Sequence, residues 1–245
     1  PQRTVAIIGT RRPSHYGIAE CEKIVEELQE YQVTILSGLA YGIDTTAHRK
    51  AVELNCPTFG ILGNGLKKIY PAANRKLATR MLEHGGVISE FQMDTEPDRE
   101  NFPKRNRIIA GLSDAVIVVE SDIKGGSIIT AEISNDYNKD VFAVPGRLHD
   151  QMSLGCNHLI KTHKANLFTS AKDIGYIMRW DKSAAPVQMS LGLDLPEEEK
   201  ILLGFLSKNV QFSIDSLSYR SGFKLSHLST MLLKLEFKGL IKSLP

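Results

Sequence analysis

Two short stretches combine basic side chains with residue types that bind anions. Lys124 precedes Gly125, Gly126 and Ser127, and residues 103–107 read PKRNR. Glycine lets a backbone approach a ligand closely, and the free N–H groups at the start of a helix bind phosphate and other anions. Positive side chains at a helix start oppose the helix dipole, so an anionic ligand would relieve that conflict. The two stretches therefore predict a site for one polyanion.

The elements that must position these residues are typical of an α/β protein. Continuous apolar runs recur along the chain, and each is followed by a helical pattern, which predicts strands buried on both faces of a parallel sheet. The sequence thus predicts a Rossmann-like, doubly wound and mostly parallel sheet. Its expected strands cover residues 4–9, 33–38, 57–63, 86–91, 114–121 and 140–146.

The loops after these strands should carry the function, because ligands of open parallel sheets bind beyond the carboxyl ends of the strands. The loops after the first, second, third and fifth strands are rich in glycine, and most of them hold Lys or Arg. Glycines also permit tight turns without any ligand, but several basic loops on one edge favour an anion site. Tyr16, Tyr41, Tyr70 and Phe102 lie among the basic residues, a mixture that suits phosphates and unstacked bases. Core packing is the more common role for most such aromatic residues.

A dinucleotide cofactor is not expected on this sheet. The first loop contains Gly9 and Gly17 but not the G-x-G-x-x-G pattern, and two arginines stand where a pyrophosphate needs bare backbone. A Walker A loop is also absent from the sequence. We therefore predict no cofactor.

Composition divides the chain into two domains of unequal size. Pro, Ser, Gly and Ala replace periodic apolar residues in residues 181–194, which predicts a linker there. Residues 1–180 form the predicted Rossmann-like domain. Residues 195–245 read as helices at helix-turn-helix spacing, with Ser213 as an N-cap and Gly222 in a turn. This pattern predicts a small winged-helix domain whose wing is incomplete.

Global composition excludes few function classes. The net charge of +2 over 245 residues is too small to identify a nucleic-acid binder. The 3 cysteines form no Cys-x-x-Cys pair, so neither a metal site nor a disulfide framework is expected, and a reducing cytoplasm fits best. No stretch approaches the roughly 18 uncharged apolar residues of a membrane span.

Several motifs, taken in order, resemble those of the DNA-processing protein A (DprA, or Smf) family. They include GTRRPSHYG, SGLAYGIDTTAH, FPKRNRIIAGLSDAVIVVES, KGGSIITAEI and SLGCNHLI, and the likeness runs from Val5 to Phe168. The resemblance implies a single-stranded DNA-binding protein of natural transformation that protects incoming strands and helps load the RecA recombinase. It also implies a homodimer built by the Rossmann-like domain. Family members often carry an N-terminal helical domain, so this chain is expected to be a short version or a piece cut before the first strand.

The resemblance assigns roles by motif. Arg11 is similar to a basic residue that grips phosphate, Arg99 to a basic loop position, and Phe102 to an aromatic residue that contacts a base. Lys124 opens the family's phosphate turn, in which Gly125 replaces the more usual serine without loss of the backbone donors. The full predicted DNA-binding set, with no catalytic residue and no metal ligand, is Arg11, Gly38, Arg99, Phe102, Arg105, Asn106, Arg107, Lys124, Gly125, Gly126 and Ser127.

Two alternatives stay open. The region around the two glycines also resembles, more distantly, lysine-decarboxylase-like phosphoribohydrolases, with Arg107 and Glu132 near their catalytic positions. The proline before the glycines of that family is missing here. The other alternative is a double-stranded DNA reader that acts through the winged helix. Its predicted recognition helix holds no arginine to pair with guanine, so weak duplex binding or a protein contact fits as well.

The segment after the sixth strand, residues 153–168, predicts the dimer contact. Leu154, Leu159, Ile160 and Leu167 give it more apolar side chains than a surface connection needs. The same side chains could instead close the last edge of the sheet.

Overall fold

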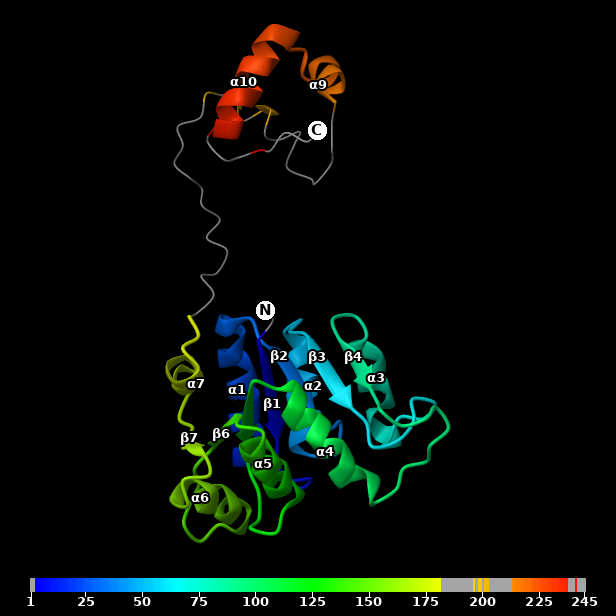
Figure 1. Ribbon diagram of the computed structural model, residues 1–245, viewed down its shortest axis with the longest axis vertical. Coiled ribbons are helices and arrows are strands. Elements are labelled where there is room, and N and C mark those ends of the chain that lie inside the picture. Colours follow the sequence, from blue (N-terminus) through cyan, green and yellow to red (C-terminus); the bar gives the residue numbers. More distant parts are fainter. Residues whose placement is uncertain are drawn as a thin grey trace. The chain divides into compact units, whose positions relative to one another are not determined.

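The computed structural model describes residues 3–181, 196, 198–199, 201–202, 213–237 and 241. Contacts divide the chain into two compact units, residues 1–185 and residues 186–245 (Figure 1). The predicted linker at 181–194 lies outside the described residues apart from Asp181.

The first unit is built on a seven-stranded sheet in the order β4-β3-β2-β1-β5-β6-β7. All of its strand pairs are parallel. This confirms the predicted Rossmann-like fold and adds a short edge strand, β7, that the apolar runs did not reveal. The strands are β1 Thr4–Ile8, β2 Thr34–Ser37, β3 Thr58–Ile61, β4 Gly86–Ile88, β5 Ala115–Val118, β6 Asp140–Ala143 and β7 Asn166–Leu167.

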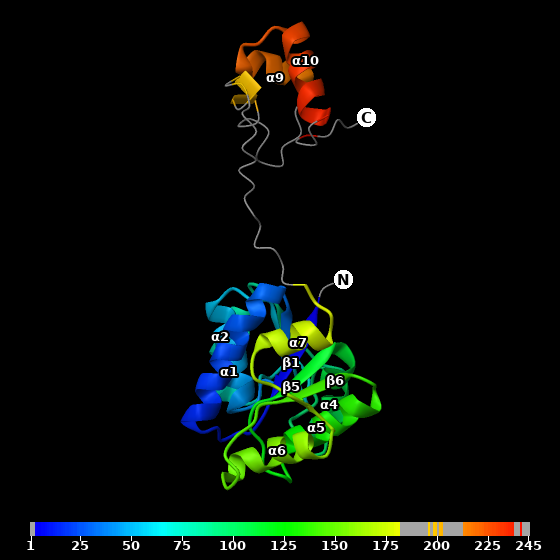
Figure 2. The same cartoon turned by 90° about the vertical axis from the view of Figure 1, so that its left-hand side faces the viewer.

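Helices cover both faces of the sheet (Figures 1 and 2). The central strand β1 shows why: Val5 and Ile7 pack into one apolar cluster, and Ala6 and Ile8 into the other. This alternation follows from the period of two in a strand. The helices are α1 His15–Leu28, α2 Ile43–Glu53, α3 Arg75–Met81, α4 Asn101–Leu112, α5 Gly126–Asp136, α6 Leu154–Lys161 and α7 Ala171–Ile177, with 3-10 turns η1 Gln29–Tyr31, η2 Ala72–Asn74 and η3 Gln151–Ser153.

Each face has its own set of helices. One cluster joins the sheet to α1, α2 and α7, and the other joins it to α4, α5 and α6. A smaller cluster, with Leu39, Leu62 and Met81, packs α3 beside β3 and β4. The chain leaves β1 towards β2 and returns to the other side of β1 with β5, so the direction of winding reverses between β1 and β5. A crevice forms at such a reversal in open α/β sheets.

The start of α1 is fixed against β5 by a buried carboxylate. Glu120, which follows β5, is 0% exposed and accepts hydrogen bonds from the backbone N–H and the hydroxyl of Ser14 at 2.9 and 2.5 Å. The Ser14 hydroxyl in turn accepts from Gly17 N and caps the helix. The negative charge of Glu120 therefore lies at the positive end of α1, where the helix dipole favours it.

The second unit contains α9 Ile214–Ser221 and α10 Leu225–Phe237. Ser213 caps α9 by accepting a hydrogen bond from Ser216 N, and Gly222 adopts the left-handed φ of 73° that ends this helix, as the sequence predicts. Apolar side chains, Leu217, Leu228 and Leu235 among them, form its core. Most of the first predicted helix and the predicted incomplete wing lie outside the described residues. Among the described helices, none is long and apolar enough to cross a membrane.

We predict that Gly42→Ala destabilises the first unit. Gly42 has φ +80°, and a Cβ there would clash with the carbonyl oxygen of Thr10 and the backbone of Arg11. A backbone conformation of this kind, which glycine adopts readily, costs a residue with a Cβ about 1–3 kcal/mol. Chemical denaturation should show at least this loss in the free energy of unfolding.

Gly111→Ala is the matched control. Gly111 lies in α4 at negative φ, and its Cβ would meet only a Tyr137 ring carbon at 3.8 Å. Alanine favours a helix over glycine by up to about 1 kcal/mol, so this variant should be as stable as the wild type or more so. A Gly42→Ala protein that matches Gly111→Ala in stability would contradict the prediction.

Candidate nucleic-acid interface

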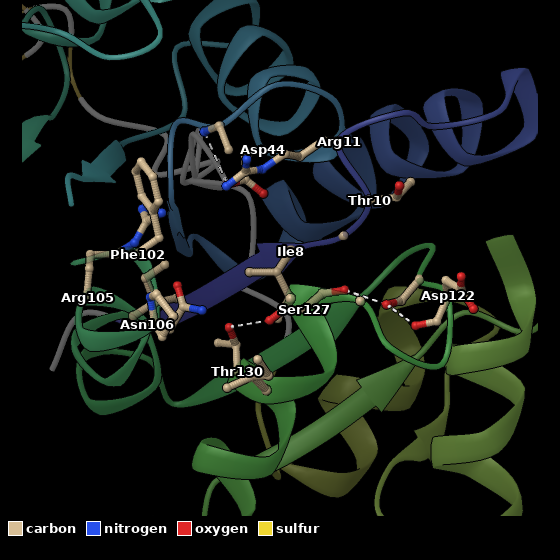
Figure 3. Close-up of a pocket in the computed structure, with 18 of the residues that line it drawn as sticks. Ile8, Thr10, Arg11, Asp44, Phe102, Arg105, Asn106, Asp122, Ser127 and Thr130 are labelled. Carbon is tan, nitrogen blue, oxygen red and sulfur yellow. Dashed lines mark hydrogen bonds between the residues drawn. The ribbon is translucent and has the colours of Figure 1, made fainter. Parts of the chain in front are cut away.

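A pocket of about 810 Å³ opens at the carboxyl ends of the strands, at the reversal between β1 and β5 (Figure 3). Its walls come from segments that are far apart in sequence: the loop after β1, the start of α2, the first turns of α4, and the loop that leads from β5 into α5. The two stretches that predicted a polyanion site, residues 103–107 and 124–127, both contribute residues to it.

A cation and two aromatic rings form one wall. The guanidinium carbon of Arg11 lies 5.4 Å from the centre of the Phe102 ring, within the range of a cation–π contact. The Phe102 ring stacks on Tyr70, with ring centres 5.8 Å apart and planes at 28°. A Cβ at Gly63 would come within 2.7 Å of the Phe102 ring, so a side chain there would displace the ring. This wall therefore places a cation that can bind a phosphate beside an aromatic surface.

The opposite wall is the start of α5. Gly125 is the N-cap residue, and the helix begins at Gly126. The hydroxyl of Ser127 donates to the hydroxyl of Ser121 at 2.7 Å, and Gly125 N donates to the carbonyl of Asp122 at 2.9 Å, so the turn is held in place. The first N–H groups of a helix have no partner within the helix, and the dipole makes this end positive. The wall therefore presents donors to an anion.

Arg105 lies at the floor of the pocket and is only 4% exposed. One of its guanidinium nitrogens donates to the carbonyl oxygens of Gly38, at 2.7 Å, and Ile61. These carbonyls follow β2 and end β3, so one side chain of α4 fixes two neighbouring strand ends. Its Nε atom is buried and has no hydrogen-bond partner among the described residues.

Burial perturbs the ionisable groups around Arg105. It lowers the pKa of Arg105 from 12.5 to about 10, and the carboxylate of Asp44 opposes this shift. Burial also raises the pKa of Asp44, against the charge of Arg105 and the N–H groups of Gly38 and Ala40, which donate to Asp44 at 3.1 and 3.3 Å. Asp44 thus both organises the loop after β2 and provides a counter-charge for Arg105.

His48, one turn further along α2, is also fully buried. The Thr58 hydroxyl donates to the carbonyl of Ile35 at 3.1 Å, so it accepts from the His48 Nδ1–H at 2.7 Å. Burial and, second, the charge of Arg105 lower the pKa of His48 from 6.5 to about 3. His48 is therefore neutral at pH 7 and adds no second positive charge behind the pocket.

The structure brings most of the predicted site residues together. Gly38 is buried behind the pocket, where a Cβ would clash with Arg105 and would meet Asp44 at 2.7 Å. Arg107 and Lys124 lie outside the pocket lining; Arg107 is paired with Glu90, and Lys124 is exposed beside the α5 turn. The predicted site residues that line the pocket are Arg11, Arg99, Phe102, Arg105, Asn106, Gly125, Gly126 and Ser127.

Other lining residues were not in the predicted set. Thr10, Pro97, Thr130 and Met152 carry no sequence signal of their own beyond their nearness to the basic loops. Asp44 could have been found, because an acidic residue in the first turn of a helix that follows a glycine-rich loop is a frequent organiser of that loop.

The residues of the hydrolase alternative are not brought into one site. Arg107 pairs with Glu90, while Glu132 pairs with Lys164 at 3.0 Å. Neither Arg107 nor Glu132 lines the pocket. Within the described part of the chain, no group of three His, Cys, Asp or Glu side chains is placed to hold a metal ion.

Family models match both parts of the chain. The model for DNA recombination-mediator protein A matches residues 1–179, and the model for the DprA winged helix domain matches residues 188–245. Among curated relatives, Protein Smf of Escherichia coli is 37% identical over 98% of this chain, and the DNA processing protein DprA of Streptococcus pneumoniae is 42% identical over 69% of it. The chain spans 66% and 60% of the lengths of these relatives.

Solved structures show the same fold. The DNA processing protein A of Streptococcus pneumoniae is 40% identical, with a TM-score of 0.67 over 74% of this chain and 62% of that chain. The protein of that name from Helicobacter pylori, described as having a unique single-stranded DNA binding mode, is 31% identical, with a TM-score of 0.67 over 73% of this chain and 82% of its own.

Arg105 and Arg107 provide a test of the buried contacts, because they lie two residues apart on α4. Arg105→Met leaves two buried carbonyls without their donor, so the free energy of unfolding should fall by about 2 kcal/mol or more. Arg107→Met removes only an exposed ion pair and should cost no more than about 1 kcal/mol. Urea denaturation of both variants measures the difference, and equal losses would contradict it.

Proposed function

The chain belongs to the DNA recombination-mediator protein A (DprA/Smf) family, and from this membership and the pocket we propose that it binds single-stranded DNA. In this proposal it acts in natural transformation, where it protects incoming strands and helps load the RecA recombinase in the cytoplasm. The observation that carries the binding function is the pocket at the β1–β5 reversal, where Arg11 and the stacked Phe102 and Tyr70 rings face the start of α5. The structure of the Helicobacter pylori relative supports the choice of single strands.

The chemistry of the two walls suits an unpaired strand. Phosphates would lie on Arg11, Arg99 and the N–H groups of Gly126 and Ser127. The partly exposed Phe102 ring would contact a base, since every base offers a flat face and such stacking tolerates any sequence. A duplex keeps its bases stacked inside and would leave this ring unused. The proposed role for Lys124 is a point charge at the rim, since it is exposed beside the same turn.

The proposed activity is binding without turnover. Hydrolysis of a glycosidic bond would need an acid or base beside the bound nucleotide. Arg107 and Glu132, the residues of the phosphoribohydrolase alternative, are engaged with Glu90 and Lys164 instead. For the second unit we propose a weak duplex or protein contact, because α10 contains no arginine and its His227 pairs with Glu198 at 3.0 Å.

Salt dependence tests the DNA site. The double variant Arg11→Ala, Lys124→Ala should bind oligothymidylate more weakly. It should also flatten the plot of log affinity against log salt by about 1.4, because it removes two phosphate contacts and each contact to a single strand contributes about 0.7 to that slope. Fluorescence anisotropy over a range of salt concentrations measures both effects.

A matched double variant controls for the loss of charge. Arg80 lies in the last turn of α3, before β4, and Lys139 directly precedes β6, so both lie towards the amino edge of the sheet. Arg80→Ala, Lys139→Ala should leave the slope at its wild-type value. If the two double variants give the same slope, the pocket is not the DNA site.

We also propose a homodimer through the Rossmann-like domain. Leu159 is 1% exposed and belongs to the core, whereas Leu167 is 49% exposed in the edge strand β7, which pairs only with β6 in the described sheet. An unpaired edge with an exposed apolar side chain can pair with a second copy. The proposed contact therefore centres on β7 and on the exposed side of α6. A dimer would carry two DNA pockets, so one strand could bind both.

Light scattering at about tens of micromolar, a range that populates weak dimers, tests this contact. Residues 1–180 should remain dimeric, and Leu167→Lys in the full chain should shift the population towards monomer. Leu82→Lys, at a 62% exposed position that follows α3, is the control and should not. A monomeric fragment of residues 1–180 would place the contact elsewhere.

A further inference from the structure

A second basic surface lies beside the pocket at the same edge of the sheet. It consists of Arg12, His15 and Tyr16 at the start of α1 and of Arg147 and His149 in the loop after β6, and we name it the α1–β6 surface. All five side chains are exposed, Tyr16 to 44%. Between the last two, Leu148 is 77% exposed. None of these residues lines the pocket.

The two halves of the α1–β6 surface are joined to each other. The Tyr16 hydroxyl donates to the carbonyl of Pro145 at 2.9 Å, although the two residues are 129 positions apart. Because β1, β5 and β6 are parallel neighbours, the segments that follow them leave the sheet side by side. The start of α1 and the loop after β6 therefore form one surface across the end of β5.

Hydrogen bonds to the rest of the domain fix the backbone of both segments, the start of α1 and the loop after β6. Ser14 is bound to the buried Glu120, as described above, which fixes the residues on either side of it. In the other segment, Gly146 N donates to Asn157 Oδ1 at 3.2 Å, and Asn157 Nδ2 donates back to the Gly146 carbonyl at 3.0 Å. The cations are thus displayed from fixed backbone, which reduces the entropy that a ligand contact would cost.

Among the described residues, the two arginines of this surface have no carboxylate partner. Within the described part of the chain, Arg12 and Arg147 form no ion pair, whereas Lys67, Lys68 and Lys164 at other loops are each paired with an acidic side chain. Two acidic residues of neighbouring loops serve their own loops: Asp122 accepts from Ile123 N and Gln151 Nε2, and Asp150 accepts from Met152 N. Glu20, further along α1, acts on Tyr16 and helps to raise its pKa, second to burial. The two arginines therefore present positive charge that no ion pair among the described residues neutralises.

The surface continues directly from the pocket. Thr10 and Arg11 line the pocket, and Arg12 is the next residue. On the other side, Met152 lines the pocket and lies in η3, which directly follows the loop that holds Arg147 and His149. A linear polyanion that occupies the pocket and extends past β5 would meet both arginines. A small ligand confined to the pocket would meet neither.

From these observations we propose that nucleotides beyond those held in the pocket run over the α1–β6 surface, with Arg12 and Arg147 on phosphates and Tyr16 against a base. This extension rests on the proposed function, since it requires single-stranded DNA in the pocket. Guanidinium groups bind phosphate in a fork geometry, and an aromatic ring among them suits an unstacked base. The strand would follow the carboxyl ends of β1, β5 and β6 in turn.

Oligonucleotide length separates the two surfaces. Single-strand sites span about 4–16 nucleotides, so oligothymidylates of about 5 and about 15 nucleotides sample the pocket alone and the pocket with its extension. The double variant Arg12→Ala, Arg147→Ala should bind the short oligonucleotide as the wild type does. For the long one, its log-affinity against log-salt slope should fall by about 1.4, because two phosphate contacts are lost at about 0.7 each. Arg12→Lys, Arg147→Lys should restore most of that slope.

Each other outcome would contradict the extension. An unchanged slope for the long oligonucleotide would show that the strand takes another path or that the surface serves a protein partner. An equal loss for both lengths would show that the variant acts on the pocket. Wild-type protein that binds neither length would reject the proposed function, and the extension with it. Arg80→Ala, Lys139→Ala is again the charge-matched control, and thermal unfolding should match the wild type, because both arginines are exposed.

Discussion

The buried guanidinium of Arg105 holds the edge of the sheet at which the pocket lies. It comes from α4, on one face of the sheet, and donates to the carbonyls of Gly38 and Ile61, at the ends of β2 and β3. Charged donors form the stronger hydrogen bonds in a protein, and a buried carbonyl without a donor is costly. The position of α4 is therefore coupled to the strand ends. Because Phe102 precedes Arg105 on the same helix, the aromatic wall of the pocket is coupled to them as well.

Burial of the Arg105 guanidinium costs desolvation free energy, and the surrounding residues reduce this cost. Burial and, to a smaller extent, the charge of Arg11 lower the pKa of Arg105, and Asp44 opposes that shift while it organises the loop after β2. His48 is kept neutral by burial and by the same guanidinium. Arg105 therefore keeps its positive charge, with Asp44 as its acidic neighbour. Its field, together with Arg11 and the start of α5, makes the floor of the pocket favourable for an anion.

Periodicity and loop position in the sequence were enough to predict the sheet and the edge at which the pocket opens, and with the family resemblance they gave eight predicted residues that line it. Parallel strands must bring their carboxyl ends together, so basic loops after different strands had to meet. The strand β7 was missed because two residues carry no periodicity. The sequence analysis treated residues 103–107 as one run of charge, so it did not predict that Arg105 is buried while Arg107 forms an exposed ion pair. Helical spacing would have distinguished them: Arg105 lies four residues before the buried Ile109, so both occupy the same face of α4.

The small net charge of the chain conceals a division between two kinds of cation. Lys67, Lys68, Arg107 and Lys164 each face a carboxylate. In the described residues Arg11, Arg12, Arg99 and Arg147 form no ion pair, and all four lie in segments at or next to the pocket. At an ionic strength near 0.15 M a charge acts over about 8 Å, so the paired cations contribute little beyond their own partners. At the pocket, the field that a DNA strand would meet therefore comes mainly from these four arginines, so their placement says more about a polyanion site than the total charge does.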